Sequence, residues 1–449
     1  MSLPRLIPTD PLSRLRLSVM LLMVCVFAPA LFRLWCIKGL IRTIRIDGGS
    51  MAEALYGNHF RVTCEDCGFT FRCDADAFPD SRRAVCPNCG YRDNELRDND
   101  LRRGERVLVD TWPYLWAAPQ RWDLVMLVEP QTGNARPATA FAVKRIAALP
   151  LERPVIRDGD LHSDSDPHQK TLQQFREQAV LVHDNDFLSS KRSDKLPKAQ
   201  RWIPFSRMSS SWHPTSSGFR FVPEKGGETV QWLEYQHWHC SASPAPRTAP
   251  AKIRDNDSYN QAKGHELYPV RDLLLRCRVK AKTGDVHVTL RDPPHILTVE
   301  LKLDERRCCV LKNDSPVGVD MLPKSSGEFQ LEAALCDGRF LFSVNRHVLA
   351  AFEYDGMPVR QNVRPAQAGE SPLRIGANGP AEISHLQVWR DIYHLTSNRL
   401  GDDWQADAPL ADGRYFLLGD NSPISIDSRH WGGGVARDQI VGRVLPLGR

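Results

Sequence analysis

Residues 338–350 read Gly-Arg-Phe-Leu-Phe-Ser-Val-Asn-Arg-His-Val-Leu-Ala, and this stretch points most directly to the fold. Within it, apolar side chains recur with the period of two that is typical of a half-buried strand. Comparable short runs occur at residues 179–182, 219–222, 273–279, 295–301, 329–333 and 381–392. Strands of this kind at such spacing predict a β-sandwich within a mainly β protein.

The stretch 338–350, followed by residues 373–376 and a strand that carries Trp389, resembles a jelly roll of the concanavalin or laminin-G type. We expect this sandwich to occupy residues 172–398. Such modules often bind sugars or proteins, but a fold alone does not give a function. Residues 237–239 (His-Trp-His) could line a ligand site, although core aromatics and satisfied histidines are the more common case. Residues 158–170, 189–198 and 241–251 are rich in turn formers and are expected to be loops or linkers.

Length and charge set wide limits on the function. A chain of 449 residues is long for one core, so two or three domains are expected. Lys and Arg number 59 against 54 acidic residues, which gives a net charge of +5. This small excess argues little for nucleic acid and is compatible with an anionic membrane surface.

The N-terminal region contains an apolar segment. Residues 17–32 carry no charge, and residues 34–37 continue the apolar character beyond Arg33. The segment 17–37 is therefore expected to be a transmembrane anchor. A cleaved signal peptide remains the alternative, because basic residues precede the apolar run and Ala28-Pro29-Ala30 forms a small-x-small site. Basic residues flank both sides, so the charges do not choose an orientation.

Four of the twelve cysteines are spaced as two C-x-x-C pairs: Cys64, Cys67, Cys86 and Cys89. Two such pairs, separated by 18 residues and each followed by a glycine, are typical of a zinc ribbon, here expected at residues 60–95. Four thiolates fill a tetrahedral shell, which favours a structural ion over a catalytic one. Two disulfides remain the alternative, since an exported domain meets an oxidising environment.

Three short stretches carry the residues of a hydrolytic site. They are Gly48-Gly49-Ser50-Met51, Phe141-Ala142-Val143-Lys144-Arg145 and residues 419–429, which read Gly-Asp-Asn-Ser-Pro-Ile-Ser-Ile-Asp-Ser-Arg. Together they indicate a serine nucleophile served by a lysine base, a variant of the serine–histidine–aspartate arrangement. In kind and order these stretches resemble the bacterial type I signal peptidases, over well under half of the chain.

The surroundings of Lys144 favour a base. By itself, a lysine in a strand is usually solvated. Here its neighbours in residues 141–148 are mostly apolar, and removal from water lowers the pKa of a lysine and makes the neutral form available. Ser50 follows two glycines, which are typical of a simple turn but also allow close approach of substrate. The Ser50 amide would then face the oxyanion, and Met51 would lie on the exposed rim.

The resemblance implies roles for individual residues. Ser50 would be the nucleophile and Lys144 the general base, with Ser425 holding the lysine amine. The supporting residues would be Asp420, Asp427, Arg429 and Arg145, and Asp427 with Arg429 would form an orienting ion pair. The catalytic core would comprise residues 38–152 and 405–449, interrupted by the two inserts. This chain departs from the family's usual residues at Gly48, Glu53, Glu105, Trp122, Leu151 and Ser422.

The function predicted on this basis is removal of signal peptides from exported preproteins by a single-pass serine endopeptidase of the inner membrane. Its catalytic part would lie outside the cytoplasm, and its chemistry would need no cofactor. The bilayer and preproteins would be its partners, with a glycan or envelope protein as a further partner of the sandwich. The alternative is a tethered glycan- or protein-binding sandwich with a degenerate protease core. A zinc-ribbon nucleic-acid binder is disfavoured by the anchor and the small net charge.

Overall fold

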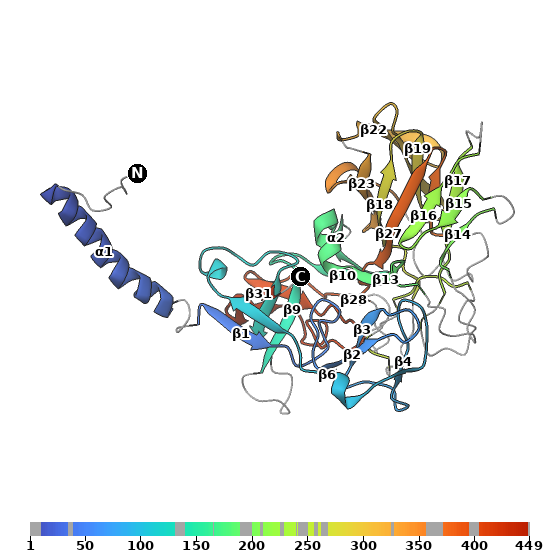
Figure 1. The fold of residues 1–449 in the computed structure, drawn as a ribbon. Helices are drawn as coiled ribbons and strands as arrows, with labels where there is room; N and C mark the ends of the chain where they lie inside the picture. The colour runs from blue at the N-terminus through green and yellow to red at the C-terminus, as the bar shows by residue number, and fades with distance from the viewer. Residues whose placement is uncertain are drawn as a thin grey trace.

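The computed structural model describes residues 10–34, 39–130, 140–164, 166–188, 200–206, 210–224, 229–238, 240, 250–255, 259–261, 268–324, 327–355, 371–394 and 404–447. The protein is mainly β, with one apolar helix near the N-terminus, as predicted. Figure 1 shows this helix extending away from the rest of the molecule.

Helix α1 spans Pro11–Phe32. It begins six residues before the predicted segment because the Asp10 carboxylate accepts hydrogen bonds from the backbone N–H groups of Leu12 and Ser13. Residues 35–38, which contain the predicted end, lie outside the described residues. The 22-residue helix is about 33 Å long and none of it is buried in the protein. By length and composition it fits either a membrane anchor or a signal sequence.

A seven-stranded sheet brings together segments from both ends of the chain. Its strand order is β1 (Ile41–Arg45), β7 (Arg106–Asp110), β31 (Ile440–Pro446), β8 (Leu124–Val128), β9 (Phe141–Ala148), β29 (Arg414–Leu418) and β30 (Val435–Ala436). Pairing of β9 with β29 places the strand that carries Lys144 beside the strand that leads into residues 419–429. Two 3-10 turns flank this sheet, at Pro113–Leu115 and Arg437–Gln439.

A second, four-stranded sheet adjoins it, in the order β12 (Asp166–Pro167), β11 (Asp160–Ser163), β10 (Pro154–Arg157) and β28 (Trp404–Gln405). The expectation of a loop over 158–170 was therefore wrong. Asp158 and Gly159 have φ values of 51° and 93°, so these turn formers make the tight connection of the β10–β11 hairpin. The other two expected linkers lie largely outside the described residues.

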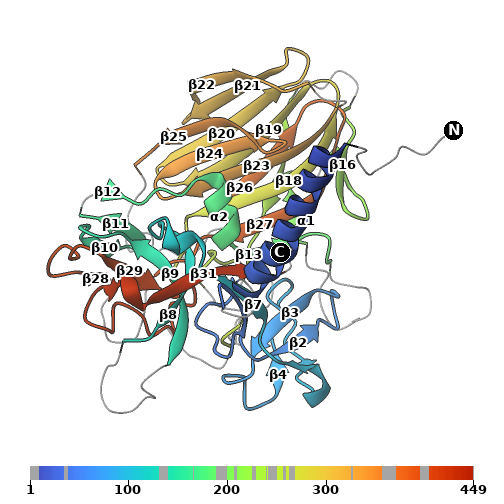
Figure 2. The same ribbon diagram turned by 90° about the vertical axis from the view of Figure 1, so that its left-hand side faces the viewer.

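The predicted β-sandwich is confirmed, and its two sheets are seen together in Figure 2. One sheet has the order β15 (Trp212–Pro214), β16 (Gly218–Phe221), β27 (Ala381–Arg390), β18 (Leu273–Ala281), β23 (Glu328–Cys336), β24 (Arg339–Val344) and β25 (His347–Glu353), with β13 (Val180–Asp184) also paired to β27. The other has the order β14 (Trp202–Pro204), β17 (Gln231–Tyr235), β26 (Leu373–Ala377), β19 (Asp285–Asp292), β20 (His295–Lys302), β21 (Arg307–Lys312) and β22 (Ser315–Met321).

The stretch 338–350 forms the β24–β25 hairpin. Asn345 and Arg346, with φ values of 50° and 68°, make its turn. Phe340 and Phe342 are fully buried in the core between the two sheets, as their spacing requires.

Residues 59–102 form a small separate region. One of its sheets joins β3 (Thr70–Asp74), β2 (His59–Thr63) and β6 (Leu101–Arg102), and the other joins β4 (Arg83–Ala84) and β5 (Asn94–Glu95). A 3-10 turn at Asp98–Asp100 precedes β6. The four motif cysteines lie in the buried cluster of this region.

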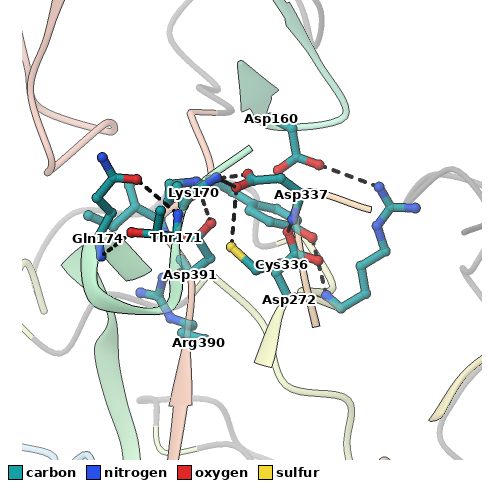
Figure 3. A network of polar contacts seen from close by, with 12 residues as sticks. Asp160, Lys170, Thr171, Gln174, Asp272, Cys336, Asp337, Arg390 and Asp391 are labelled. Atoms are coloured by element: carbon teal, nitrogen blue, oxygen red, sulfur yellow. Dashed lines mark hydrogen bonds and ion pairs between the residues drawn. The ribbon is translucent and has the colours of Figure 1, made fainter. Parts of the chain in front are cut away.

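Buried charges join the sandwich to the sheets below it (Figure 3). Lys170 precedes helix α2 (Leu172–Gln178), and its Nζ donates to Asp337 and Asp391 at 2.8 Å each. The same ammonium lies 5.0 Å from the ring centroid of Trp122, next to β8. Burial, reinforced by the charge of Asp337, raises the pKa of Asp160 to about 7. Removing any one of these charges would leave its partner unbalanced in the interior.

Candidate active site

Ser50 and Lys144 lie within hydrogen-bond distance, although 94 positions separate them in the chain. Ser50 is on the turn after β1, and Lys144 is on β9. The Lys144 Nζ atom lies 2.9 Å from the Ser50 Oγ atom. Lys144 is only 3% exposed. A nucleophile and a base at this distance meet the geometric requirement for proton transfer.

The environment of Lys144 favours its neutral form. Burial lowers the pKa of Lys144 to about 8, against the opposing attraction of Asp427. A lysine in water has a pKa near 10.4, so the buried amine loses its proton much closer to neutral pH.

A hydrolytic reaction that uses Lys144 as its base should become faster as the pH rises through about 8. Below that value the amine is protonated and cannot accept the proton of Ser50, so kcat should fall about tenfold per pH unit. Above it, the rate should level off. A pH profile of kcat measures this directly, and a profile that is flat between pH 6 and 9 would exclude Lys144 as the base.

Arg145, the next residue on β9, faces Asp420. Its Nε and Nη2 atoms donate to the two carboxylate oxygens at 2.8 and 2.5 Å, and its Nη1 donates to the Trp122 carbonyl at 3.0 Å. Both side chains are buried. This bidentate pair ties β9 to the start of residues 419–429.

Asp420→Asn should destabilise the protein by about 3 to 5 kcal/mol, because it leaves the Arg145 guanidinium buried without a counter-charge. The midpoint of urea unfolding, followed by tryptophan fluorescence, reports the change. Asp412→Asn is the matched control, since Asp412 is exposed. Equal midpoints for the two variants would show that the pair contributes nothing to stability.

Asp427 and Arg429 form a second buried pair. The Arg429 Nε and Nη2 atoms donate to the two Asp427 oxygens at 2.8 and 2.7 Å. Burial would raise the pKa of Asp427, but the charge of Arg429 and hydrogen bonds from His430 and Arg429 hold it well below its usual range. Asp427 also accepts from the Gly419 N–H at 3.1 Å, so the pair sets the shape of this loop.

Two details differ from expectation. The Ser425 hydroxyl makes no hydrogen bond within the described residues, so the predicted bond to the Lys144 amine is absent. It lies instead over Gly419, where an added Cβ would be 2.1 Å from it. Met51 is 1% exposed, and it packs with Leu55 in a core cluster because the chain turns inward after Ser50.

The structure shows the surroundings of several positions where the sequence departs from the signal peptidases that it resembles. Trp122 and Leu151 stand at positions where the sequence resemblance implies glycine, and their φ values are 72° and 69°. Both positions thus keep a left-handed backbone that favours glycine. At Gly48 an added Cβ would meet nothing within 4 Å, so there is room but no hydroxyl. Ser422 accepts from the Arg429 Nη1 atom at 3.0 Å.

Two asparagines near Ser50 were not predicted. Asn421 donates from its backbone N–H to the Ser50 carbonyl at 3.0 Å, and from its side chain to the Gly49 carbonyl at 2.8 Å. Asn260, from the region between β17 and β18, hydrogen bonds to the Asn421 side chain. Asn421 lies inside the third stretch, but no local signal distinguishes Asn260.

The four motif cysteines converge. Their Sγ atoms all lie within 4.8 Å of one another, and the residues are buried. The Sγ atoms of Cys64 and Cys89 are 3.6 Å apart, and those of Cys67 and Cys86 are 3.7 Å apart. These separations are too long for disulfides and are close to the edge of a tetrahedron with Zn–S bonds of about 2.3 Å. The four sulfurs therefore fit a zinc ion.

Residues 237 and 238 belong to the interior. The His237 Nδ1 atom lies 2.7 Å from Arg201, and the Arg201 guanidinium stacks 4.1 Å from the Trp238 ring centroid. Both residues are buried, so they form part of the core rather than an open ligand site. His239 lies outside the described residues.

One comparison with known proteins gives a match for the C-terminal part of the chain. Residues 355–447 match the family described as signal peptidase, peptidase S26. The match contains residues 419–429 but neither Ser50 nor Lys144. This C-terminal part is therefore similar to the signal peptidases. None of the curated proteins matches the chain.

Several solved structures resemble this chain weakly. The carbohydrate-binding module CBM66 from Bacillus subtilis is 9% identical, with a TM-score of 0.26, over 41% of this chain and 93% of the module. A galectin from Caenorhabditis elegans is 18% identical (TM-score 0.20; 27% of this chain and 82% of that one). A sialidase from Trypanosoma rangeli is 13% identical, with a TM-score of 0.23, over 40% of this chain and 26% of the sialidase. At these scores the likenesses assign no activity to this chain.

Proposed function

We propose that this chain is a membrane-bound serine endopeptidase that removes signal peptides from exported preproteins. The observation that carries the proposal is the 2.9 Å approach of the Lys144 amine to the Ser50 hydroxyl, with that amine buried and its pKa lowered to about 8. The match of residues 355–447 to the signal peptidases supports the same reaction class.

In the proposed mechanism, neutral Lys144 takes the hydroxyl proton of Ser50 as Oγ attacks the scissile carbonyl carbon. The Ser50 backbone N–H stabilises the oxyanion. The Lys144 ammonium then gives its proton to the leaving amine as the peptide bond breaks, which leaves an acyl-enzyme. A water molecule, deprotonated by Lys144, attacks the ester carbonyl carbon, and the bond from this carbon to Oγ breaks as Lys144 returns the proton to the Ser50 Oγ atom. The substrate would bind as an extended strand.

Helix α1 would anchor the protein in the membrane, with the catalytic part outside the cytoplasm, where exported chains emerge. We further propose that Cys64, Cys67, Cys86 and Cys89 hold a structural zinc ion, which takes no part in the reaction because four protein ligands leave no open position.

Cleavage of a preprotein by the purified full-length protein in lipid vesicles tests the proposal. The wild type should cut at one site, and Ser50→Ala should lose at least about 1000-fold in rate, since it removes the nucleophile. Ser315→Ala, an exposed serine on β22, is the matched control and should be fully active. An inert wild type that binds glycans tightly would instead establish a binding protein with a degenerate protease core.

A further inference from the structure

Residues 259–261 lie directly against the turn that carries Ser50. Tyr259 and Asn260 are buried, at 0% and 2% exposure. A Cβ added at Gly49 would lie 2.6 Å from the Tyr259 ring. The ring therefore packs on the Gly49 backbone, where no larger residue fits without displacing it.

Asn421 donates hydrogen bonds to the backbone carbonyls of both Gly49 and Ser50. Its backbone N–H donates to the Ser50 oxygen at 3.0 Å, and its side-chain amide donates to the Gly49 oxygen at 2.8 Å. The bond to Gly49 therefore requires the amide nitrogen of Asn421 to face the Gly49 oxygen.

The side-chain amide of Asn260 pairs with the side-chain amide of Asn421. Its amide nitrogen donates to the Asn421 Oδ1 atom at 2.6 Å, and its Oδ1 atom accepts from the Asn421 Nδ2 atom at 3.0 Å. An asparagine amide carries two donor hydrogens. One of those on Asn421 serves the Gly49 oxygen and the other serves Asn260, so a flipped Asn421 would lose all of these bonds.

The segment is itself fixed to the cysteine-bearing region. The Gln261 side chain accepts from the Val85 N–H at 2.7 Å and donates to the Val85 carbonyl at 2.9 Å. The backbone carbonyl of Tyr259 accepts from the Asp74 N–H at 2.9 Å, and the side-chain hydroxyl of Tyr259 donates to the Asn58 carbonyl at 3.2 Å. Asn260 is therefore presented from a braced segment, which makes it suitable for orienting another side chain.

We propose that Asn260 is a positioning residue that orients Ser50 through Asn421, so that residues 259–261, which lie between β17 and β18 in the chain, contribute to the active site. The catalytic part of this proposal rests on the proposed peptidase function. Displacement of a reacting group by about 1 Å costs on the order of 100-fold in rate, so small errors at Asn421 should be visible in kcat.

Asn260→Asp is the discriminating variant because it keeps the size of the side chain and replaces the donor NH2 group by an acceptor oxygen. One carboxylate oxygen would face the Asn421 Oδ1 atom, and because both atoms only accept hydrogen bonds, the contact would displace the Asn421 side chain. We expect kcat to fall about 10- to 100-fold, with KM changed less than about twofold. Asn313→Asp is the control, because it makes the same change in the sandwich and keeps the acceptor for the Ile296 N–H.

A readout without catalysis separates this proposal from the proposed function. Hydrogen exchange of the peptide covering residues 48–55 should be faster in Asn260→Asp than in the wild type and unchanged in Asn313→Asp. Exchange that is the same in all three proteins would overturn the positioning role, whatever the activity. Faster exchange in Asn260→Asp with an inert wild type would keep the role in ordering the turn and reject the peptidase function.

If Asn260→Asp and Asn421→Asp each retain measurable activity, a double-mutant cycle that combines them gives a further test. Two residues that act through one contact should be strongly non-additive, with the double variant little worse than the poorer single one. Losses in kcat that multiply independently would contradict the proposal.

Discussion

Lys144→Met is expected to remove preprotein cleavage while making the folded protein more stable at neutral pH. Methionine fills a similar volume but accepts no proton, so the rate should fall on the order of 10⁴-fold or more. The gain in stability has a separate origin. Folding lowers the pKa of Lys144 to about 8, so at pH 7 the native protein holds a buried charge at a cost of about 3 kcal/mol, which methionine avoids.

The pH dependence of this gain has a definite sign. Because the folded pKa of Lys144 is depressed, the unfolded chain binds more protons between pH 8 and 10.5, and wild-type stability rises over that window. The advantage of Lys144→Met should therefore be largest below pH 8 and should disappear near pH 10.5. Urea unfolding at several pH values measures it, with Lys280→Met, an exposed lysine on β18, as the control. A variant that is less stable than the wild type at pH 7 would contradict the burial argument.

Cys86→Ser is expected to abolish binding of the proposed zinc ion and to unfold the region around residues 59–102. Binding of structural zinc contributes about 10 to 16 kcal/mol to the folding of zinc-finger peptides, and this region has only a small apolar core of its own. Metal analysis should find one zinc per wild-type chain and much less in the variant. Limited proteolysis should cut the variant within residues 59–102.

Cys309→Ser, on a strand of the sandwich, is the control for this experiment and should keep its zinc. A wild type with less than one zinc per chain and with the four thiols oxidised would overturn the metal assignment. Since Gln261 binds Val85, next to Cys86, loss of the metal should also speed hydrogen exchange at residues 48–55.

Local patterns predicted the strands well because a strand's periodicity is written in consecutive residues. The run 339–344 became β24, with its aromatic residues inside. The sequence does not reveal the hairpin at residues 154–163, because its turn formers predict a long loop. It does not reveal the burial of Met51 either, because that burial depends on how the chain bends after Ser50. The roles of Ser50 and Lys144 remain predictions, although the structure brings the two side chains together.

The sequence by itself determined the mainly β class, the apolar N-terminal helix, the paired cysteines and the residue types of a serine–lysine site, because each is expressed within a few neighbouring positions. Only the tertiary structure decided the rest. The lowered pKa of Lys144 comes from burial beneath distant segments, and the Asn260–Asn421 contact joins residues 161 positions apart. Desolvation and long-range hydrogen bonds depend on which surfaces meet, and no short stretch of sequence specifies that.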